Sequence, residues 1–382
     1  MAPAAVLWLP LCMSGSMALA HARSVFPSIG GAWGAPRVAA VAAALVFGGA
    51  VAHAQSVPAA PSGPAAQLPP TATIPLLPRP DRSGFTNFVR VTAGGGQGGT
   101  ALLDTGSTGL RIRQEALGPD VKLTDIPVEY SYSSGNVLHG VLGYAIVAFP
   151  GSTPAVATAK PIAIQVVQSI TCKPEVPNCP KWKPTEVGVM GVAYNPVAAV
   201  NPLAQLPGHW SNGFIVIAND RTDPNLMPRI EVGLTPQNSA GFATAPFQPA
   251  NGQQPEGLKA WNTKSIPTCF AVDGGAPGCF ATVFDTGASA GSFETPGLDP
   301  ARLLTRVPPG HTITTTVAGV MQLTLTSGRK AWLNRYRYAP PHGGVLGFNS
   351  GGLVFRYYRV LYAAVAGRIG FSPVGPITAT RP

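Results

Sequence analysis

Short apolar runs interrupted by glycine and proline are the main pattern along this chain. No window of about 20 residues carries the 3.6-residue apolar repeat of a sustained amphipathic helix. The chain has 45 Gly and 41 Pro among 382 residues, and only 11% of its residues are charged. Apolar runs bounded by turn-forming residues predict many short β-strands and therefore an all-β fold.

Two segments share one arrangement, in which an apolar run leads directly into Asp-Thr-Gly. The first is ALLDTGSTGL, residues 101–110, with Asp104, and the second is ATVFDTGASA, residues 281–290, with Asp285. A single Asp-Thr-Gly is weak evidence, because these residues are common in turns. Two copies, each after a strand-like run, favour aspartates that are presented for chemistry.

A second parallel feature follows each motif. The segment VGVMGVAYNP has two apolar residues before Gly191, and GGVLGFNS has two before Gly347. Each half of the chain therefore has the order strand, Asp-Thr-Gly, further strands and apolar-apolar-Gly. This order indicates a divergent internal duplication, with units of about 150 residues, which is an ordinary domain size. Two such lobes facing each other would bring Asp104 and Asp285 together at their junction.

These motifs resemble those of the pepsin-like aspartic proteases. The resemblance covers roughly residues 73–375 and also includes FIVIAND, RIEVGLTP, LVFRYYRVLYAAVAGRIGFSPV and a flap-like YSYSSGNVLHGVLGY. It implies a bilobal fold of two β-barrel-like lobes with a central cleft. The first lobe is expected at residues 73–235 and the second at residues 236–382.

The resemblance implies that Asp104 and Asp285 activate a water molecule to hydrolyse a peptide or protein substrate, without a metal or a cofactor. Two carboxylates a few Å apart share one proton, as is known for the pair in this family. The residues that the resemblance assigns to the two catalytic turns are Thr105, Gly106, Ser107, Thr286, Gly287 and Ala288. It implies that Thr105 and Thr286 cross-brace the turns. Ser107 is expected to hydrogen-bond the outer oxygen of Asp104, and the glycines to leave room for water.

Departures from the family's pattern change what we expect. Ala288 has no hydroxyl to donate to Asp285, so we expect a raised upper pKa of the pair and an activity optimum less acidic than that of pepsin. Arg111 stands where the family usually has a tryptophan that contacts the flap tyrosine. Tyr132 is the predicted flap tyrosine, with Tyr130 as its rival.

The N-terminal region is predicted to be removed. RVAAVAAALVFGGAVAHAQS has one base, an apolar run and Ala-His-Ala before Gln55, which is the layout of a secretory signal cleaved after Ala54. We assign residues 1–54 to this extension and residues 55–72, rich in proline and alanine, to a linker. An uncleaved anchor is the alternative, although the run is short for a transmembrane helix. The pattern predicts a secreted or periplasmic bacterial protein without stable membrane insertion.

Cysteine usage agrees with export. Four cysteines follow the predicted cleavage site in two close pairs, Cys172 with Cys179 and Cys269 with Cys279. Close pairs in an exported chain predict two local disulfides. A four-cysteine zinc site is the alternative, but these spacings are longer than the CxxC pairs typical of zinc.

The charge distribution argues against nucleic-acid binding. The formal net charge of +10 is spread thinly, without a block of Lys and Arg. Nucleic-acid binding needs a clustered basic face, so we expect no such partner. We expect a monomer.

Two other functions compete with hydrolysis by the aspartates. GASAG, residues 287–291, matches the nucleophile elbow of serine hydrolases with Ser289, but that elbow needs a helix directly after the serine. The segment GSFETPGLDP that follows is poor helix material. The stronger rival is a catalytically silent binding or inhibitor protein of the same fold, which Arg111 favours. An Asn replacement of either motif aspartate separates the two, because only an enzyme would lose activity.

Overall fold

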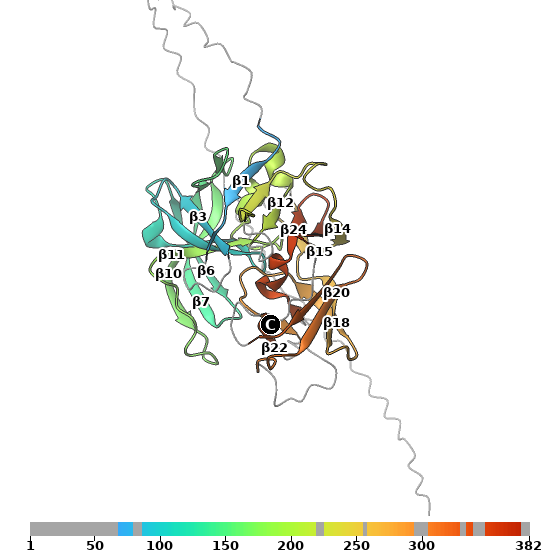
Figure 1. Ribbon diagram of the computed structural model, residues 1–382. Coiled ribbons are helices and arrows are strands. Elements are labelled where there is room, and N and C mark those ends of the chain that lie inside the picture. The colour runs from blue at the N-terminus through green and yellow to red at the C-terminus, as the bar shows by residue number, and fades with distance from the viewer. Residues whose placement is uncertain are drawn as a thin grey trace, which may run out of the picture. The chain divides into compact units, whose positions relative to one another are not determined.

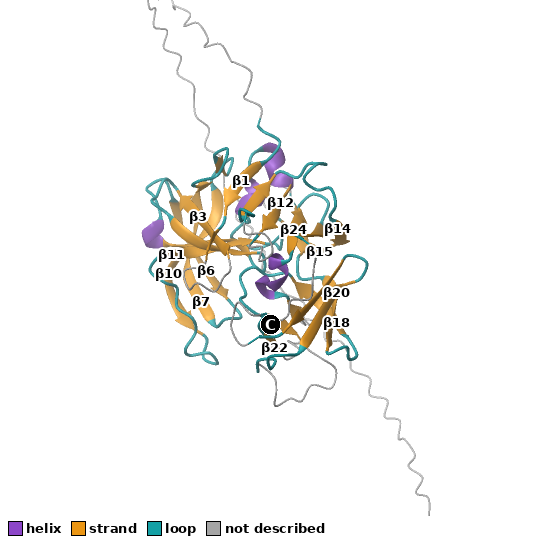
Figure 2. Ribbon diagram, in the orientation of Figure 1, coloured by secondary structure: helices purple, strands orange, loops and turns teal. Residues whose placement is uncertain are grey.

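Strands make up most of the described chain, as the pattern of short apolar runs predicts (Figure 1). The computed structural model describes residues 68–78, 86–218, 225–254, 258–293, 305–328, 334–338 and 348–375. Helical segments there are short 3-10 helices (Figure 2): η1 (Gln114–Ala116), η2 (Pro202–Gln205), η3 (Gly208–Asn212) and η6 (Gly351–Arg356). Within these ranges no helix is long and apolar enough to cross a membrane. The predicted extension at residues 1–54, the linker up to residue 67, and Gly347 lie outside the described residues.

The first half of the chain forms a ten-stranded sheet. Its strands are β2 (Leu77–Pro78), β3 (Thr86–Ala93), β4 (Gly99–Asp104), β5 (Thr108–Arg113), β6 (Lys122–Ser131), β7 (Asn136–Ala145), β8 (Val147–Phe149), β9 (Val156–Ala157), β10 (Ile162–Cys172) and β11 (Glu186–Val192). They are ordered β6-β7-β10-β5-β11-β4-β3-β8-β9, with β2 beside β3. The parallel neighbour of β4 is β11, which places Gly191 opposite Asp104. The first Asp-Thr-Gly is therefore delivered from the interior of this sheet.

A seven-stranded sheet carries the second motif. Its strands are β17 (Ile266–Val272), β18 (Gly278–Val283), β19 (Gly291–Phe293), β20 (Thr312–Val317), β21 (Met321–Thr326), β22 (Tyr336–Tyr338) and β23 (Phe348–Asn349). Their order is β21-β20-β17-β18-β23-β19-β22. Here β18 runs parallel to β23, with Val283 opposite Asn349. The same parallel pairing therefore occurs in both halves: the strand before Asp-Thr-Gly lies beside the strand at or directly after apolar-apolar-Gly.

A six-stranded sheet joins strands from the two halves. Its strands are β1 (Ala72–Pro75), β12 (Gly213–Ile217), β13 (Arg229–Val232), β14 (Ala243–Pro246), β24 (Tyr358–Ala363) and β25 (Arg368–Pro373). Their order is β1-β13-β12-β24-β25-β14, and a separate hairpin consists of β15 (Gln248–Gln253) and β16 (Lys259–Asn262). Ala72, which the sequence places in the linker, already pairs with Val232. The last residue of the predicted linker therefore belongs to the fold.

Buried aromatic side chains connect this shared sheet to the turn that carries Asp285. The rings of Phe214 and Tyr362 stack with their centroids 5.0 Å apart. The hydroxyl of Tyr362 donates to the carbonyl of Phe284 over 3.0 Å, and the hydroxyl of Tyr194 donates to the carbonyl of Tyr362 over 3.0 Å. Because Phe284 directly precedes Asp285, the aromatic core fixes the backbone on which the second aspartate is carried.

Both predicted disulfides are present. One joins Cys172, the last residue of β10, to Cys179 in the loop that follows. The other joins Cys269 and Cys279, which lie opposite each other on β17 and β18. Among the described residues, no group of three or more His, Cys, Asp or Glu could hold a metal ion.

Candidate active site

The two aspartates come together where β4 and β18 end. Both are buried, with 6% of Asp104 and 9% of Asp285 exposed. A Cβ atom built on Gly287 would lie 2.8 Å from Oδ1 of Asp104 and 3.0 Å from Oδ1 of Asp285. A Cβ atom on Gly106 would lie 2.7 Å from the carboxyl carbon of Asp285. Any side chain at either glycine would collide with the carboxyl groups, which explains the third residue of both motifs.

The two catalytic turns are tied to each other through their threonines. The N–H of Thr105 donates to Oγ1 of Thr286 over 3.1 Å, and the N–H of Thr286 donates to Oγ1 of Thr105 over 3.0 Å. The hydroxyls donate in turn, that of Thr105 to the carbonyl of Phe284 (2.7 Å) and that of Thr286 to the carbonyl of Leu103 (2.6 Å). Since these buried groups are all paired, the two turns have one relative position.

A third residue supports this brace from the first half of the chain. The side-chain amide of Asn87, on β3, donates to the carbonyl of Thr286 over 2.6 Å and is 3% exposed. The sequence offered no signal for it, because Asn87 lies far from both motifs.

The first carboxylate accepts two hydrogen bonds from its own turn. The N–H of Gly106 donates to Oδ1 of Asp104 over 2.8 Å, and the hydroxyl of Ser107 donates to Oδ2 over 2.6 Å. The structure therefore brings Ser107 to the outer oxygen that the resemblance assigns to it.

The second carboxylate has a donor that the sequence analysis missed. The N–H of Gly287 donates to Oδ1 of Asp285 over 2.7 Å, and Nδ2 of Asn349 donates to Oδ2 over 2.7 Å. Ala288 supplies no donor, and the amide of Asn349 takes the place of the missing hydroxyl at the outer oxygen. Asn349 lies on β23, beside the strand that leads to Asp285. The only available signal was a polar residue two positions after the glycine of the second apolar-apolar-Gly segment.

The pKa of Asp285 is raised to about 7. Burial is the largest cause, because it disfavours the charged carboxylate, and the negative charge of Asp104 adds to it. The hydrogen bonds from Asn349 and from the N–H of Gly287 act in the opposite direction. The pair therefore holds one proton from acidic to near-neutral pH and titrates as a unit. One ionised and one protonated carboxyl are the groups that general base and general acid catalysis need on one substrate.

The β6–β7 hairpin carries Tyr132, the predicted flap tyrosine, and its rival Tyr130. Tyr130 lines a cavity of about 470 Å³ together with Gly106 and Ser107 of the first catalytic turn. The ring of Tyr132 meets that of Tyr130 edge-on, with the centroids 4.9 Å apart. In the described part of the chain the cavity wall includes Tyr130 and not Tyr132, so the geometry favours Tyr130, the rival, as the tyrosine that faces the cleft.

Arg111 packs against the flap tyrosines. It is 2% exposed, and its guanidinium carbon lies 3.4 Å from the ring centroid of Tyr130 and 5.8 Å from that of Tyr132. Its Nη1 donates to the carbonyl of Gly109 over 3.0 Å. A cation–π contact to the flap thus occupies the position where the family's tryptophan was expected.

The rest of the cavity wall is rich in polar groups. The other described residues that line it are Thr108, Asn195, Pro196, Val197, Pro249, Ala250, Asn251, Asn262 and Lys264. Amide and ammonium groups in a concave site can hydrogen-bond the main chain of an extended peptide and fix its direction.

Ser289 does not lie in a nucleophile elbow. The next regular element after it is the strand β19, and no helix follows it within residues 289–293. Its hydroxyl accepts a hydrogen bond from Nη2 of Arg335 over 2.8 Å. Of the two downstream histidines, His311 binds Oδ2 of Asp273 over 2.6 Å, and His342 lies outside the described residues. The strand–turn–helix context of a serine hydrolase is therefore absent at this serine.

Comparison with known proteins identifies the fold. No protein-family model matches this sequence, and no curated protein matches it. Among solved structures the chain is similar to the aspartic proteinase from Irpex lacteus, with a TM-score of 0.55 and 15% sequence identity over 81% of this chain and 99% of that one. A likeness at this identity establishes the architecture and leaves the activity to the site itself. The chain therefore has the all-β, bilobal pepsin-like fold.

Proposed function

We propose that this protein is an aspartic endopeptidase that hydrolyses peptide or protein substrates through the pair Asp104 and Asp285. One observation carries the proposal: two buried carboxyl groups converge from two Asp-Thr-Gly turns, and the pKa of one is raised to about 7. Such a pair holds a base and an acid side by side in the same pH range.

The reaction follows from the charge state of the pair. In the proposed reaction Asp285, whose pKa is raised by burial and by the charge of Asp104, acts as the acid, and Asp104 acts as the base. Asp104 takes a proton from a water molecule while the water oxygen bonds to the scissile carbonyl carbon, and Asp285 gives its proton to the carbonyl oxygen. The C–N bond then breaks, and the leaving nitrogen takes the proton held by Asp104. One hydroxyl of the intermediate returns a proton to Asp285, which restores the pair.

We also propose a weakly acidic activity optimum, less acidic than that of pepsin. The support now comes from the burial of Asp285 and the charge of Asp104, rather than from the missing hydroxyl of Ala288. The singly protonated pair persists towards pH 7 because the pKa of Asp285 is about 7.

The proposal extends to where the protein acts. We propose a secreted or periplasmic bacterial monomer that has lost residues 1–54 and whose lobes divide near residue 235. Two disulfides support an oxidising compartment. The signal-like segment supports export.

The test is cleavage of a diverse peptide mixture by the exported protein between about pH 3 and 8, with and without pepstatin. We expect cuts that pepstatin blocks and that Asp285→Asn reduces by about 10³-fold or more. Asp273→Asn is the matched control, because Asp273 is an exposed aspartate of the same half and should leave the cleavage rate unchanged. A folded parent protein that cleaves nothing at any pH would instead favour the binding-protein alternative.

A further inference from the structure

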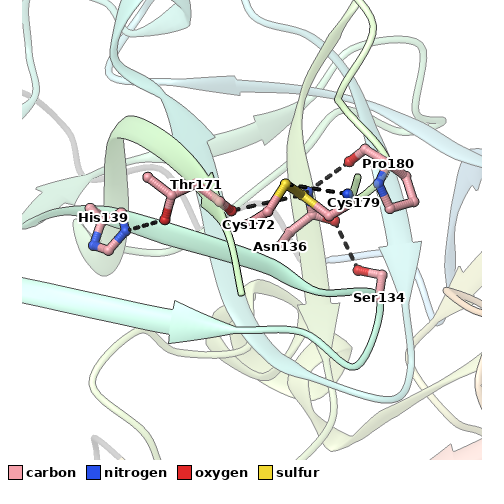
Figure 3. The surroundings of a disulfide bond; sticks show 7 residues. All are labelled: Ser134, Asn136, His139, Thr171, Cys172, Cys179 and Pro180. Carbon is pink, nitrogen blue, oxygen red and sulfur yellow. Dashed lines mark hydrogen bonds between the residues drawn. A yellow bond between two sulfur atoms is a disulfide. The ribbon is translucent and has the colours of Figure 1, made fainter. Parts of the chain in front are cut away.

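The tip of the β6–β7 hairpin is fastened to the loop that the Cys172–Cys179 disulfide closes. Figure 3 shows the side chain of Asn136, the first residue of β7, directed at this disulfide. Its Nδ2 donates to Sγ of Cys179 over 3.3 Å and to the carbonyl of Pro180 over 2.6 Å. Its Oδ1 accepts from the hydroxyl of Ser134, in the hairpin turn, over 2.8 Å. Asn136 is only 4% exposed, so both ends of a buried amide are used to join the tip to the loop.

Main-chain contacts join the same two segments. Cys172 lies opposite Asn136 where β10 ends beside β7, and the N–H of Lys173 donates to the carbonyl of Gly135 over 2.8 Å. A Cβ atom on Gly135 would lie 2.7 Å from Cβ of Val176 in the loop, so the turn and the loop touch with no space between them. The φ of +95° at Gly135 also requires glycine. The anchor is therefore made of side-chain, main-chain and packing contacts.

Both partners of this contact lead to the catalytic residues. In one direction β6 carries Tyr130, which lines the cavity with Gly106. In the other direction the chain runs from the disulfide loop into β11, where Gly191 lies opposite Asp104. The anchor thus fixes the flap tip to a covalently closed loop that leads into the strand beside the first aspartate.

We propose that Asn136 and the Cys172–Cys179 disulfide are positioning residues that hold the flap, and with it Tyr130, in register with the catalytic pair. The role as a flap rests on the proposed function. With the anchor intact, the flap and the loop move as one body, so the flap is ordered during folding instead of during substrate binding. Without the anchor, the conformational entropy of the flap is lost when substrate binds, so the binding step becomes less favourable. Loss of the anchor therefore raises KM and leaves kcat and the pH profile in place, because no donor to either carboxyl group is altered.

The first test is Asn136→Asp, which keeps the shape of the side chain and its acceptor for Ser134 but removes both donated hydrogen bonds. We expect KM for a peptide substrate to rise about fivefold to tenfold, the range that the loss of a buried hydrogen bond predicts, with kcat within about twofold. Thr171→Val is the matched control. It removes the exposed bond between Thr171 and His139 (2.8 Å), on the same two strands, and leaves the anchor intact.

The second test measures, in the absence of substrate, whether the anchor holds the hairpin tip against the loop. Hydrogen–deuterium exchange at the amide of Lys173, which donates to the hairpin turn, is compared between two double variants. We expect exchange about tenfold faster in Cys172→Ser/Cys179→Ser than in the parent, as for a local opening. We expect no change at Lys173 in Cys269→Ser/Cys279→Ser, which removes the other disulfide from the seven-stranded sheet.

The outcomes separate the two proposals. Unchanged exchange at Lys173 together with unchanged KM in a folded Asn136→Asp protein would overturn the anchor. A fall in kcat that follows a lowered melting temperature, with KM constant, would also overturn it, since that is the signature of a merely structural role. If the parent protein cleaves nothing, the proposed function fails, and the exchange at Lys173 still decides whether the loop holds the hairpin.

Discussion

Asn349 shows how one side chain can influence the pKa of a candidate catalytic group from a distant part of the chain. It lies 64 residues beyond Asp285 and donates to the outer oxygen of that carboxylate over 2.7 Å. Its own Oδ1 accepts from the N–H of Gly351 over 2.7 Å, which orients the amide so that Nδ2 faces the carboxylate. A hydrogen bond to the charged form lowers a carboxyl pKa. Asn349 therefore opposes the rise that burial causes.

Replacement of Asn349 by Ala should move the upper limb of the pH profile. Without the amide donor, the pKa of Asp285 rises further above its present value of about 7. We expect the basic limb of the kcat/KM profile to shift upward by about 1 to 2 pH units, as for the loss of one hydrogen bond to a charged group. The measurement is the initial rate of peptide cleavage between about pH 4 and 9. A basic limb that stays in place in Asn349→Ala would contradict this role.

At the scale of elements, the β6–β7 hairpin is also held behind its tip by polar side chains from neighbouring strands. Gln165 on β10 is fully buried, and its Nε2 donates to the carbonyls of Val128 on β6 and Leu138 on β7, both over 3.0 Å. Gln165 lies opposite Arg111 of β5, whose guanidinium stacks on Tyr130. Together with the anchor at the tip, these contacts attach the hairpin to its neighbouring strands at two points along its length.

Gln165→Met should therefore destabilise the protein, although the volume of the side chain hardly changes. The substitution leaves two carbonyls of the flap strands without their side-chain donor, which costs about 1–3 kcal/mol. Chemical denaturation measures the free energy of unfolding. The control is Gln168→Met, at an exposed position of the same strand, where we expect a change within about 0.5 kcal/mol. Equal effects of the two substitutions would argue against this account of the hairpin.

At the scale of the whole molecule, folding is what creates the buried pair of carboxyl groups. The six-stranded sheet pairs β12 with β24, from different halves of the chain, and the threonines of the two turns brace each other. The two aspartates meet only when these contacts form, so their ionisation is linked to global stability.

The sign of this linkage gives a testable trend. Asp285 has a pKa of about 7 in the folded protein, against an ordinary pKa of 3.8 for an aspartate. Between these values the folded state binds the proton more tightly than the unfolded state does. The contribution therefore favours folding below about pH 4 and is lost as the pH rises towards about 7. We expect the melting temperature of the parent to fall relative to that of Asp285→Asn across this interval, measured by scanning calorimetry. A difference between the parent and Asp285→Asn that stays constant across this interval would contradict the linkage.

Local patterns were enough to predict a large part of the fold and of the candidate site. The short apolar runs predicted an all-β chain, because the period and length of such runs are properties of each strand alone. The repeated order around Asp104 and Asp285 predicted two facing halves. The cysteine pairs could be assigned because the partners lie close in sequence. The linker boundary was placed too late, since nothing local showed that Ala72 pairs with Val232.

The sequence by itself determined the candidates for the proposed chemistry, the two aspartates and the turns that present them, because each motif is contiguous. Only the tertiary structure decided which distant groups adjust that chemistry. Asn349 replaces the missing hydroxyl of Ala288, and Tyr130 lines the cavity in preference to Tyr132. Asn136 meets the disulfide loop only through the register of β7 and β10. The physical reason is the same in each case: strand register and side-chain direction are set by long-range pairing, which no local pattern of residues encodes.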